Sequence, residues 1–217
     1  MCYNVYVRLI KNIITEEREL SKELMNNEKI ILTDCDGVLL AWEGAFHEWM
    51  ISKGFTKKEE ATYDISKTFG IPKSLGKKLV KEFNESAWMG FLPAYKDARS
   101  GVAKLVEHGW KFVVITSLSL DPKAQMLRVS NLKNIFGKNV FVDVVCLDTG
   151  EDKDEELVKF DGSGLWWIED KPENAECGLK YGLKPIIIEH DHNKDHKVDG
   201  IVYAYDWEAI FNIIEGA

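Results

Sequence analysis

The chain has 217 residues, of which 45% are hydrophobic and 29% are charged, and its net charge is −8. This length fits one domain, or one domain with an insertion, and the composition supplies enough apolar side chains for a core. The acidic balance argues against a general DNA- or RNA-binding protein, which needs a basic face. It leaves open a small anionic substrate that is held by a few local cations or a metal ion.

The cysteines and the apolar segments indicate the cell compartment. Four cysteines are scattered along the chain and form no CxxC pair, so we expect neither a disulfide framework nor a zinc site. The opening "MCYNVYVRLIKN" lacks the long apolar segment of a signal peptide, and no apolar run approaches the roughly 18 residues of a membrane span. We therefore expect a cytoplasmic protein that makes no contact with a membrane.

Short apolar runs alternate with helical segments along most of the chain. After a polar helix expected over 15–26, strands are expected at 29–34, 111–117, 140–148, 164–170 and 184–190, and residues 200–205 are a further candidate strand. Helices are expected at 97–110, 121–137, 152–160, 171–182 and 206–214. Such alternation predicts βαβ units and a mainly parallel sheet, in a Rossmann-like three-layer α/β sandwich.

One helical block breaks this alternation. Residues 41–92 are charged and helical in pattern, with pieces that end at Gly54 and Gly70 or begin at Pro72, and they directly follow the first strand. We interpret this block as a helical cap inserted over the sheet. The catalytic core would then comprise residues 1–40 and 93–217, with 1–28 as an N-terminal extension.

Polar residues follow the predicted strands at the ends where ligands bind in open parallel sheets. We expect these groups to meet at one edge of the sheet: Asp34, Asp36, Thr116, Ser117, Lys153, Glu169 and Asp170.

The spacing of Asp34 and Asp36 has a chemical reason. Residues i and i+2 of an extended segment point to the same side, and two carboxylates on one side repel unless a cation lies beside them. Mg²⁺, which prefers oxygen ligands, would relieve this repulsion together with Asp170. Gly37 lets the backbone turn sharply next to such a ligand.

This set of groups can carry out phosphoryl transfer. A carboxylate can attack phosphorus and form an aspartyl-phosphate, and a second acid can protonate the leaving oxygen and later activate water. A lysine and a threonine hydroxyl can hold the phosphoryl oxygens.

The motifs resemble a known superfamily. "DCDGV", "VVITS", Lys153 and "WWIED" resemble the four motifs of the haloacid dehalogenase superfamily, and the second aspartate is typical of its phosphatases. "DCDGVLLAWEGAF" is similar to the opening of the 5′(3′)-deoxyribonucleotidases, and "TSLSLDPK", "FGKNVFVDVVCLDTGEDK" and "HDHN…YDWEAI" are similar to later parts of that family. The likeness runs from about Lys29 to the C-terminus and is weakest in the cap.

The resemblance implies a role for each matching residue. Asp34 would be the nucleophile, and Asp36 the acid and base, with its backbone carbonyl on Mg²⁺. Thr116 and Ser117 would bind phosphate. Lys153 would neutralise charge. Asp34 and Asp170 would be further metal ligands, and Glu169, in place of the family's usual aspartate, would also belong to the metal site and reach a metal-bound water.

The resemblance also implies a pocket for a nucleobase. Trp42 matches by position an aromatic residue that stacks on the base, and Trp88 and Phe91 lie where the cap returns to the core and would complete this pocket. The family's acidic residue after "DGVL" is replaced by Ala41, which leaves the nucleoside preference open.

Other charged residues have simpler interpretations. Lys123 is a rival of Lys153 for the phosphate, and Lys123 or Arg128 could contact phosphate or sugar, although a solvated position is the favoured interpretation for each. His190, His192 and His196 lack a fourth ligand at a recognised spacing, so a polar loop is favoured over a metal site.

We therefore expect a Mg²⁺-dependent phosphatase that acts on nucleoside monophosphates, most of all deoxyribonucleotides, without a stable nucleic-acid partner. The alternatives are another phosphomonoester such as a sugar phosphate, a nucleic-acid 3′-phosphate end, a phospho-acceptor domain like response-regulator receivers, and a nucleotide-binding protein without hydrolysis. The oligomeric state stays open, with a homodimer among the alternatives.

Overall fold

The computed structural model describes residues 29–58 and 64–216. The helix expected over 15–26 lies outside these residues. The piece of the predicted helical block that ends at Gly70 is only partly inside them, and its described end forms α3.

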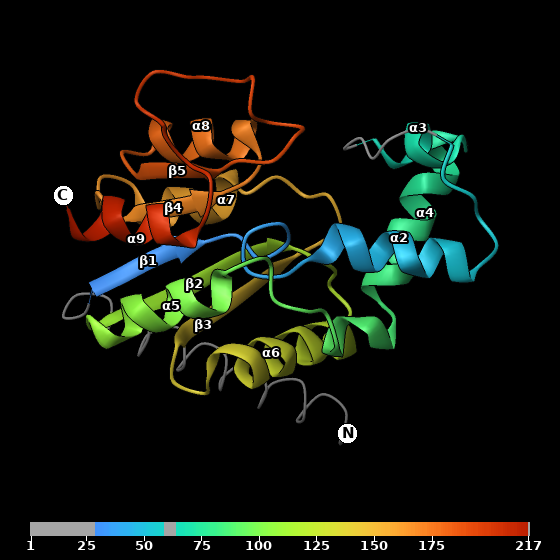
Figure 1. The fold of residues 1–217 in the computed structure, drawn as a ribbon, viewed down its shortest axis with the longest axis horizontal. Coiled ribbons are helices and arrows are strands. Elements are labelled where there is room, and N and C mark those ends of the chain that lie inside the picture. Colours follow the sequence, from blue (N-terminus) through green and yellow to red (C-terminus); the bar gives the residue numbers. More distant parts are fainter. Residues whose placement is uncertain (1–28, 59–63, 217) are drawn as a thin grey trace, which may run out of the picture.

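Within the described residues, a six-stranded sheet forms the centre of the fold (Figure 1). The strands are β1 (Lys29–Thr33), β2 (Trp110–Ser117), β3 (Phe141–Leu147), β4 (Trp166–Glu169), β5 (Lys184–Ile188) and β6 (Val202–Ala204). All neighbours are parallel, in the order β3-β2-β1-β4-β5-β6. The predicted parallel α/β sheet is confirmed, and the candidate sixth strand is one of its edges.

Helices cover both faces of the sheet. The cluster on one face includes α5 (Ala98–Glu107), α6 (Pro122–Phe136) and α9 (Trp207–Glu215). On the other face lie α7 (Asp154–Leu157), the short η2 (Val158–Phe160) and α8 (Pro172–Lys180). Residues 30–32 of β1 alternate between the two clusters and are at most 1% exposed. This two-sided burial explains why the strand reads as a continuous apolar run.

A helical segment follows β1, as predicted. It comprises α2 (Trp42–Ser52), α3 (Ile65–Phe69), α4 (Lys73–Asn84) and η1 (Ala87–Gly90). Figure 1 shows these helices beyond the carboxyl ends of β1 and β2, with α2 leading away from the sheet. The division into separate domains at 41 and 92 stays a prediction.

Aromatic packing holds this segment together. The ring of Phe46 stacks on Trp42 at 4.8 Å and meets Phe83 of α4 edge-on at 5.3 Å. Buried Asn84, at the end of α4, accepts a hydrogen bond from Trp42 Nε1 at 2.9 Å and donates one to the Leu118 carbonyl at 2.8 Å. The helical segment is thereby tied to the loop after β2.

A second connection ties α9 to the loop that follows β1. Trp207, at the start of α9, is fully buried and donates from Nε1 to the Val38 carbonyl at 3.0 Å. Asp97 directly precedes α5, but its carboxylate accepts from the backbone N–H of Trp207 at 3.1 Å, beside Asp206, the N-cap of α9. In the part of the chain that is described, no helix has the length and apolarity of a membrane span.

Candidate active site

Asp34 and Glu169 meet at the carboxyl edge of the sheet, because they follow and end the neighbouring strands β1 and β4. The backbone N–H of Asp34 donates to the Ile168 carbonyl at 2.8 Å, which continues the pairing of these strands. Lys153 reaches both carboxylates from the loop after β3, with its Nζ 2.7 Å from Asp34 Oδ1 and 2.7 Å from Glu169 Oε1. All three residues are buried.

Asp170 completes the cluster. One carboxylate oxygen from each of Asp34, Glu169 and Asp170 lies within 4.8 Å of the others. Gly37 passes directly over Asp170 with φ +80°, and a Cβ at this position would lie 2.4 Å from Asp170 Oδ2. A glycine is therefore required here both for the turn and for the close approach.

Burial dominates the electrostatics of the cluster. It raises the pKa of Asp34 from 3.8 to about 7, even though Lys153 lies beside it. Burial, and then the charges of Glu169 and Asp34, raise the pKa of Asp170 well above its ordinary value. Burial also opposes ionisation of Glu169, but Lys153 and several hydrogen bonds hold the pKa of Glu169 below its usual range.

These residues fit a hard divalent cation. Among the described residues, three buried carboxylates face one ammonium group, that of Lys153, so this ionised cluster carries two negative charges in excess. Each oxygen of Glu169 already accepts two hydrogen bonds, from Lys153 and Asn174 and from the backbone N–H groups of Asp170 and Lys171. Asp34 and Asp170 are thus the carboxylates available to a metal ion such as Mg²⁺, and Glu169 anchors the groups around them.

Asp36 is held by an arginine that the sequence interpretation placed in solvent. Arg128 of α6 is fully buried, donates from Nη1 to Asp36 Oδ1, and donates from Nη2 to Asp36 Oδ2 at 3.1 Å. Its Nη1 also lies 2.8 Å from Cys35 Sγ, and its Nη2 lies 3.3 Å from the sulfur of Met89 in η1. The solvated position predicted for Arg128 is therefore wrong, because the guanidinium pairs with a carboxylate inside the core.

The remaining predicted polar residues lie in different surroundings. Thr116 is buried at the end of β2. Ser117 donates from Oγ to the Glu151 carbonyl at 2.7 Å, which fixes the loop that carries Lys153. Lys123 is exposed in the first turn of α6.

The three aromatic candidates also differ in their surroundings. Trp42 is partly buried, with one face on Phe46. Trp88 is 37% exposed and lies 6.1 Å from the Phe83 ring, centroid to centroid. Phe91 is 80% exposed and lines a surface groove of about 450 Å³ with residues of α5 and α6, such as Arg99. Neither Asp34 nor Asp170 lines this groove.

Part of the histidine-rich loop also belongs to the site. His190 Nε2 and His192 Nε2 each lie 3.9 Å from Asp170 Oδ2, and burial lowers the pKa of His190 to about 4. His196 lies elsewhere and pairs with Glu176 at 3.0 Å.

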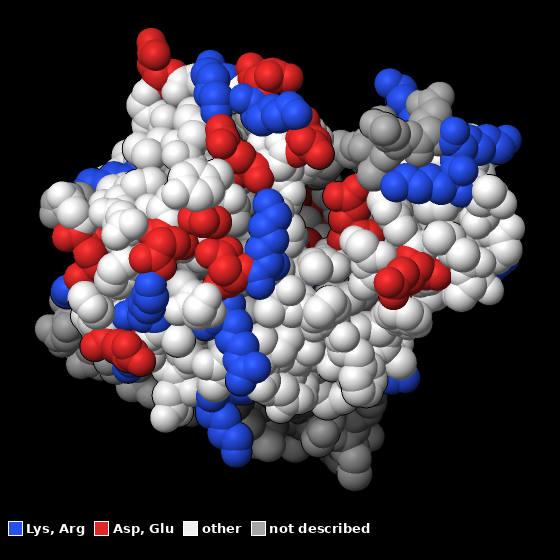
Figure 2. Space-filling view, viewed as in Figure 1, with Lys and Arg blue, Asp and Glu red and all other residues white. Residues whose placement is uncertain are grey.

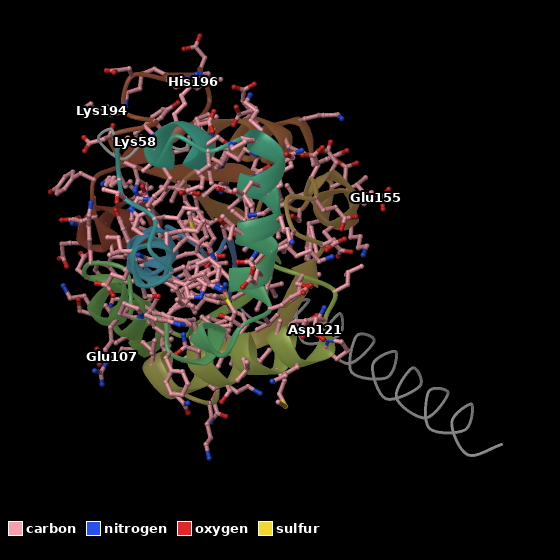
Figure 3. All side chains as sticks on the ribbon, turned by 90° about the vertical axis from the view of Figure 1, so that its right-hand side faces the viewer. Lys58, Glu107, Asp121, Glu155, Lys194 and His196 are labelled. Carbon is pink, nitrogen blue, oxygen red and sulfur yellow. The ribbon has the colours of Figure 1, made fainter. Side chains whose placement is uncertain are left out.

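Two views show the molecule around the α2–α4 segment. Figure 2 shows a hollow between the body of the sheet and the α2–α4 segment, with acidic side chains beside it. Figure 3, seen from the side of that segment, shows Lys194 and His196 on one side of the molecule and Glu155 of α7 on the other, with Asp121 near the start of α6 below.

Comparison with solved structures identifies the fold. A haloacid dehalogenase-like hydrolase from Streptococcus pneumoniae aligns with a TM-score of 0.58 and 12% identity, over 86% of this chain and 98% of that chain. A D,D-heptose bisphosphate phosphatase from B. bronchiseptica, complexed with magnesium and phosphate, aligns with a TM-score of 0.53 and 12% identity, over 87% and 99%. A putative β-phosphoglucomutase from Thermotoga maritima aligns with a TM-score of 0.55 and 17% identity, over 87% of this chain and 99% of that chain. The protein therefore has the fold of the haloacid dehalogenase superfamily.

Sequence comparison adds a family. No family model matches the sequence. The chain is 30% identical over 191 residues to an uncharacterised 32.4 kDa protein from the Gp30-rIII intergenic region of Enterobacteria phage T4. The aligned part covers 84% of this chain and 68% of the phage protein. The chain belongs to the same family as this phage protein.

Proposed function

We propose that the protein is a Mg²⁺-dependent phosphomonoester hydrolase that forms an aspartyl-phosphate on Asp34. The observation that supports this most strongly is the position of Asp34 at the end of β1, 2.7 Å from Lys153 and within 4.8 Å of carboxylate oxygens of Glu169 and Asp170. The fold and the sequence motifs agree with this chemistry.

In the first step, a carboxylate oxygen of Asp34 attacks phosphorus, and the bond between phosphorus and the ester oxygen breaks. Lys153 neutralises charge on Asp34 and on the transferred phosphoryl group, and the Thr116 hydroxyl binds a phosphoryl oxygen. Asp36 donates the proton that the leaving oxygen needs. Arg128 occupies one lone pair on each oxygen of Asp36, and a second lone pair on either oxygen can carry this proton.

In the second step, water attacks phosphorus and the bond between phosphorus and Asp34 breaks. Asp36 takes a proton from this water, so the step releases inorganic phosphate and restores both aspartates.

Asp34 and Asp170, with the backbone carbonyl of Asp36, would hold the Mg²⁺ ion. When bound, the ion would screen the negative substrate from the Asp34 carboxylate.

For the substrate, we propose nucleoside monophosphates, and deoxyribonucleotides above all. The support is the resemblance in "DCDGVLLAWEGAF" to the deoxyribonucleotidases, together with the position of Trp42 at the start of α2 and the exposure of Trp88. We place the hydrolysis in the cytoplasm, with residues 41–92 acting as a cap over the site.

A phosphate-release assay tests this proposal. The panel contains 5′- and 3′-monophosphates of deoxyribo- and ribonucleosides, sugar phosphates and an oligonucleotide with a 3′-phosphate, each with Mg²⁺ or with a chelator. We expect Mg²⁺-dependent release, fastest for a deoxyribonucleotide, and loss of release in Asp34→Asn. Asp152→Asn is the matched control, because it removes the same charge from an exposed position beside Lys153. Preference for a sugar phosphate would correct the substrate, and absence of release from every ester would refute the proposal.

A further inference from the structure

The loop after β5, which the sequence interpretation left as a polar loop, makes directed contacts with the site. Asn193 is 1% exposed. Its Nδ2 donates to the Asp170 carbonyl at 2.6 Å and to the Ile188 carbonyl at 3.0 Å, and its Oδ1 accepts from the His190 backbone N–H at 2.8 Å. Both amide hydrogens and the amide oxygen are therefore used to hold the backbone of Asp170 against the end of β5.

The imidazole of His190 contacts the other turn of the site. Its Nε2 lies 2.9 Å from the Gly37 carbonyl, and its Nδ1 lies 3.2 Å from the hydroxyl of Tyr95. Because a carbonyl only accepts, Nε2 carries the hydrogen, and Nδ1 then accepts from the tyrosine. A neutral ring in this single tautomer satisfies both contacts, so both nitrogens are occupied and His190 is not free to bind a metal ion.

These contacts join two segments that are far apart in the sequence. Gly37 follows Asp36 in the turn after β1, and Asp170 follows β4. The two turns pack so closely that a side chain at Gly37 would meet Asp170 Oδ2. The stacked rings of His190 and His192, 5.0 Å apart, cover the same carboxylate. A shift of either turn would change the separation of the Asp34 and Asp170 carboxylates.

We propose that His190 and Asn193 are positioning residues, which clamp the Gly37 turn and the Asp170 backbone together and so set the spacing of the two carboxylates for a divalent cation. This inference rests on the proposed function, because it assumes that Asp34 and Asp170 bind the ion. Outer contacts of this kind typically change metal affinity by roughly 10–100-fold when they are removed.

The test measures the affinity of the resting protein for Mg²⁺ by calorimetry, and for Mn²⁺ by its electron paramagnetic resonance signal, without substrate. His190→Phe keeps an aromatic ring and loses both hydrogen bonds, and Asn193→Ala loses all three. We expect the dissociation constant of each variant to rise by about 10-fold or more. His196→Phe is the matched control in the same loop, because its ring is 51% exposed and pairs with Glu176 away from the site.

A single-atom variant keeps the proposal testable if the larger changes prevent folding. Tyr95→Phe removes only the hydroxyl that donates to His190 Nδ1 and leaves the packed rings, whose centroids are 4.9 Å apart, in place. We expect a smaller rise in the metal dissociation constant, with the control unchanged. Folded variants that bind the ion as tightly as the unaltered protein would overturn the inference alone. An unaltered protein that binds no divalent ion would overturn the proposed function as well.

Discussion

Replacing Asp34 with asparagine should stabilise the metal-free protein at pH 8, although it removes the proposed nucleophile. Burial raises the pKa of Asp34 from 3.8 to about 7, so the folded state binds this proton more tightly than the unfolded state does. Stability is therefore lost as the pH rises from about 4 to about 7, and the loss persists above that range. At about 1.4 kcal/mol per pKa unit, the full cost of ionising Asp34 is about 4 kcal/mol.

Asparagine has nearly the same shape but never ionises, and Lys153 keeps Glu169 at 2.7 Å as its partner. The gain in the free energy of unfolding should grow from about 2 kcal/mol at pH 5 to about 4 kcal/mol at pH 8. Urea unfolding in a chelator at both pH values measures this gain, with Asp152→Asn as the control. Added Mg²⁺ should stabilise the unaltered protein more than the variant at pH 8. A variant that is less stable than the unaltered protein at pH 8 in chelator would refute the reasoning.

Three further substitutions test separate contacts. Asp36→Asn leaves the buried Arg128 without its carboxylate and should lower the free energy of unfolding by about 3 kcal/mol, measured in urea; an unchanged value would contradict the pairing. Gly37→Ala forces a side chain toward Asp170 at φ +80° and should weaken Mg²⁺ binding in calorimetry as well as cost about 1–3 kcal/mol of stability; an unchanged affinity would argue against the close approach. Asn84→Ala leaves a tryptophan N–H and a carbonyl without their partner and should cost about 1–3 kcal/mol in thermal or urea unfolding, whereas a neutral effect would show that water replaces the amide.

The sheet and its ligand-binding edge could be predicted because both depend on local patterns. Short β-branched runs such as "KIILT" form strands that are buried on both faces, and their continuous apolar pattern correctly predicted a parallel sheet. Asp34, Lys153, Glu169 and Asp170 could be predicted to meet because they all follow or end strands of that sheet. The strand order was not predictable in the same way, because it depends on which crossover connects which strands.

The prediction of a solvated position for Arg128 was wrong because it followed from the charge of the side chain and ignored the position of the residue on the helix. Ala124, Arg128 and Leu132 are four residues apart on α6 and all buried, so helical periodicity could have assigned the arginine to the core face. The burial of a charged group then required a partner, and Asp36 supplies it.

The contacts of His190 and Asn193 had no comparable signal. His190 meets Gly37 across 153 positions of the sequence, and nothing in the local pattern specifies such a contact. Asp97 shows the same limit, because the sequence predicts a helix that begins there, but its carboxylate accepts from the backbone N–H of Trp207 in α9, more than 100 positions away.

The account depends above all on Asp34 as a covalent nucleophile, and trapping the phosphorylated enzyme tests this most directly. The unaltered protein would be quenched in acid during Mg²⁺-dependent turnover of its best substrate, treated with borohydride, and mapped by mass spectrometry. The account predicts reductive conversion of Asp34 alone, dependent on substrate and absent from Asp34→Asn. Continued phosphate release by Asp34→Asn at the full rate, or a phosphorylated residue other than Asp34, would contradict it.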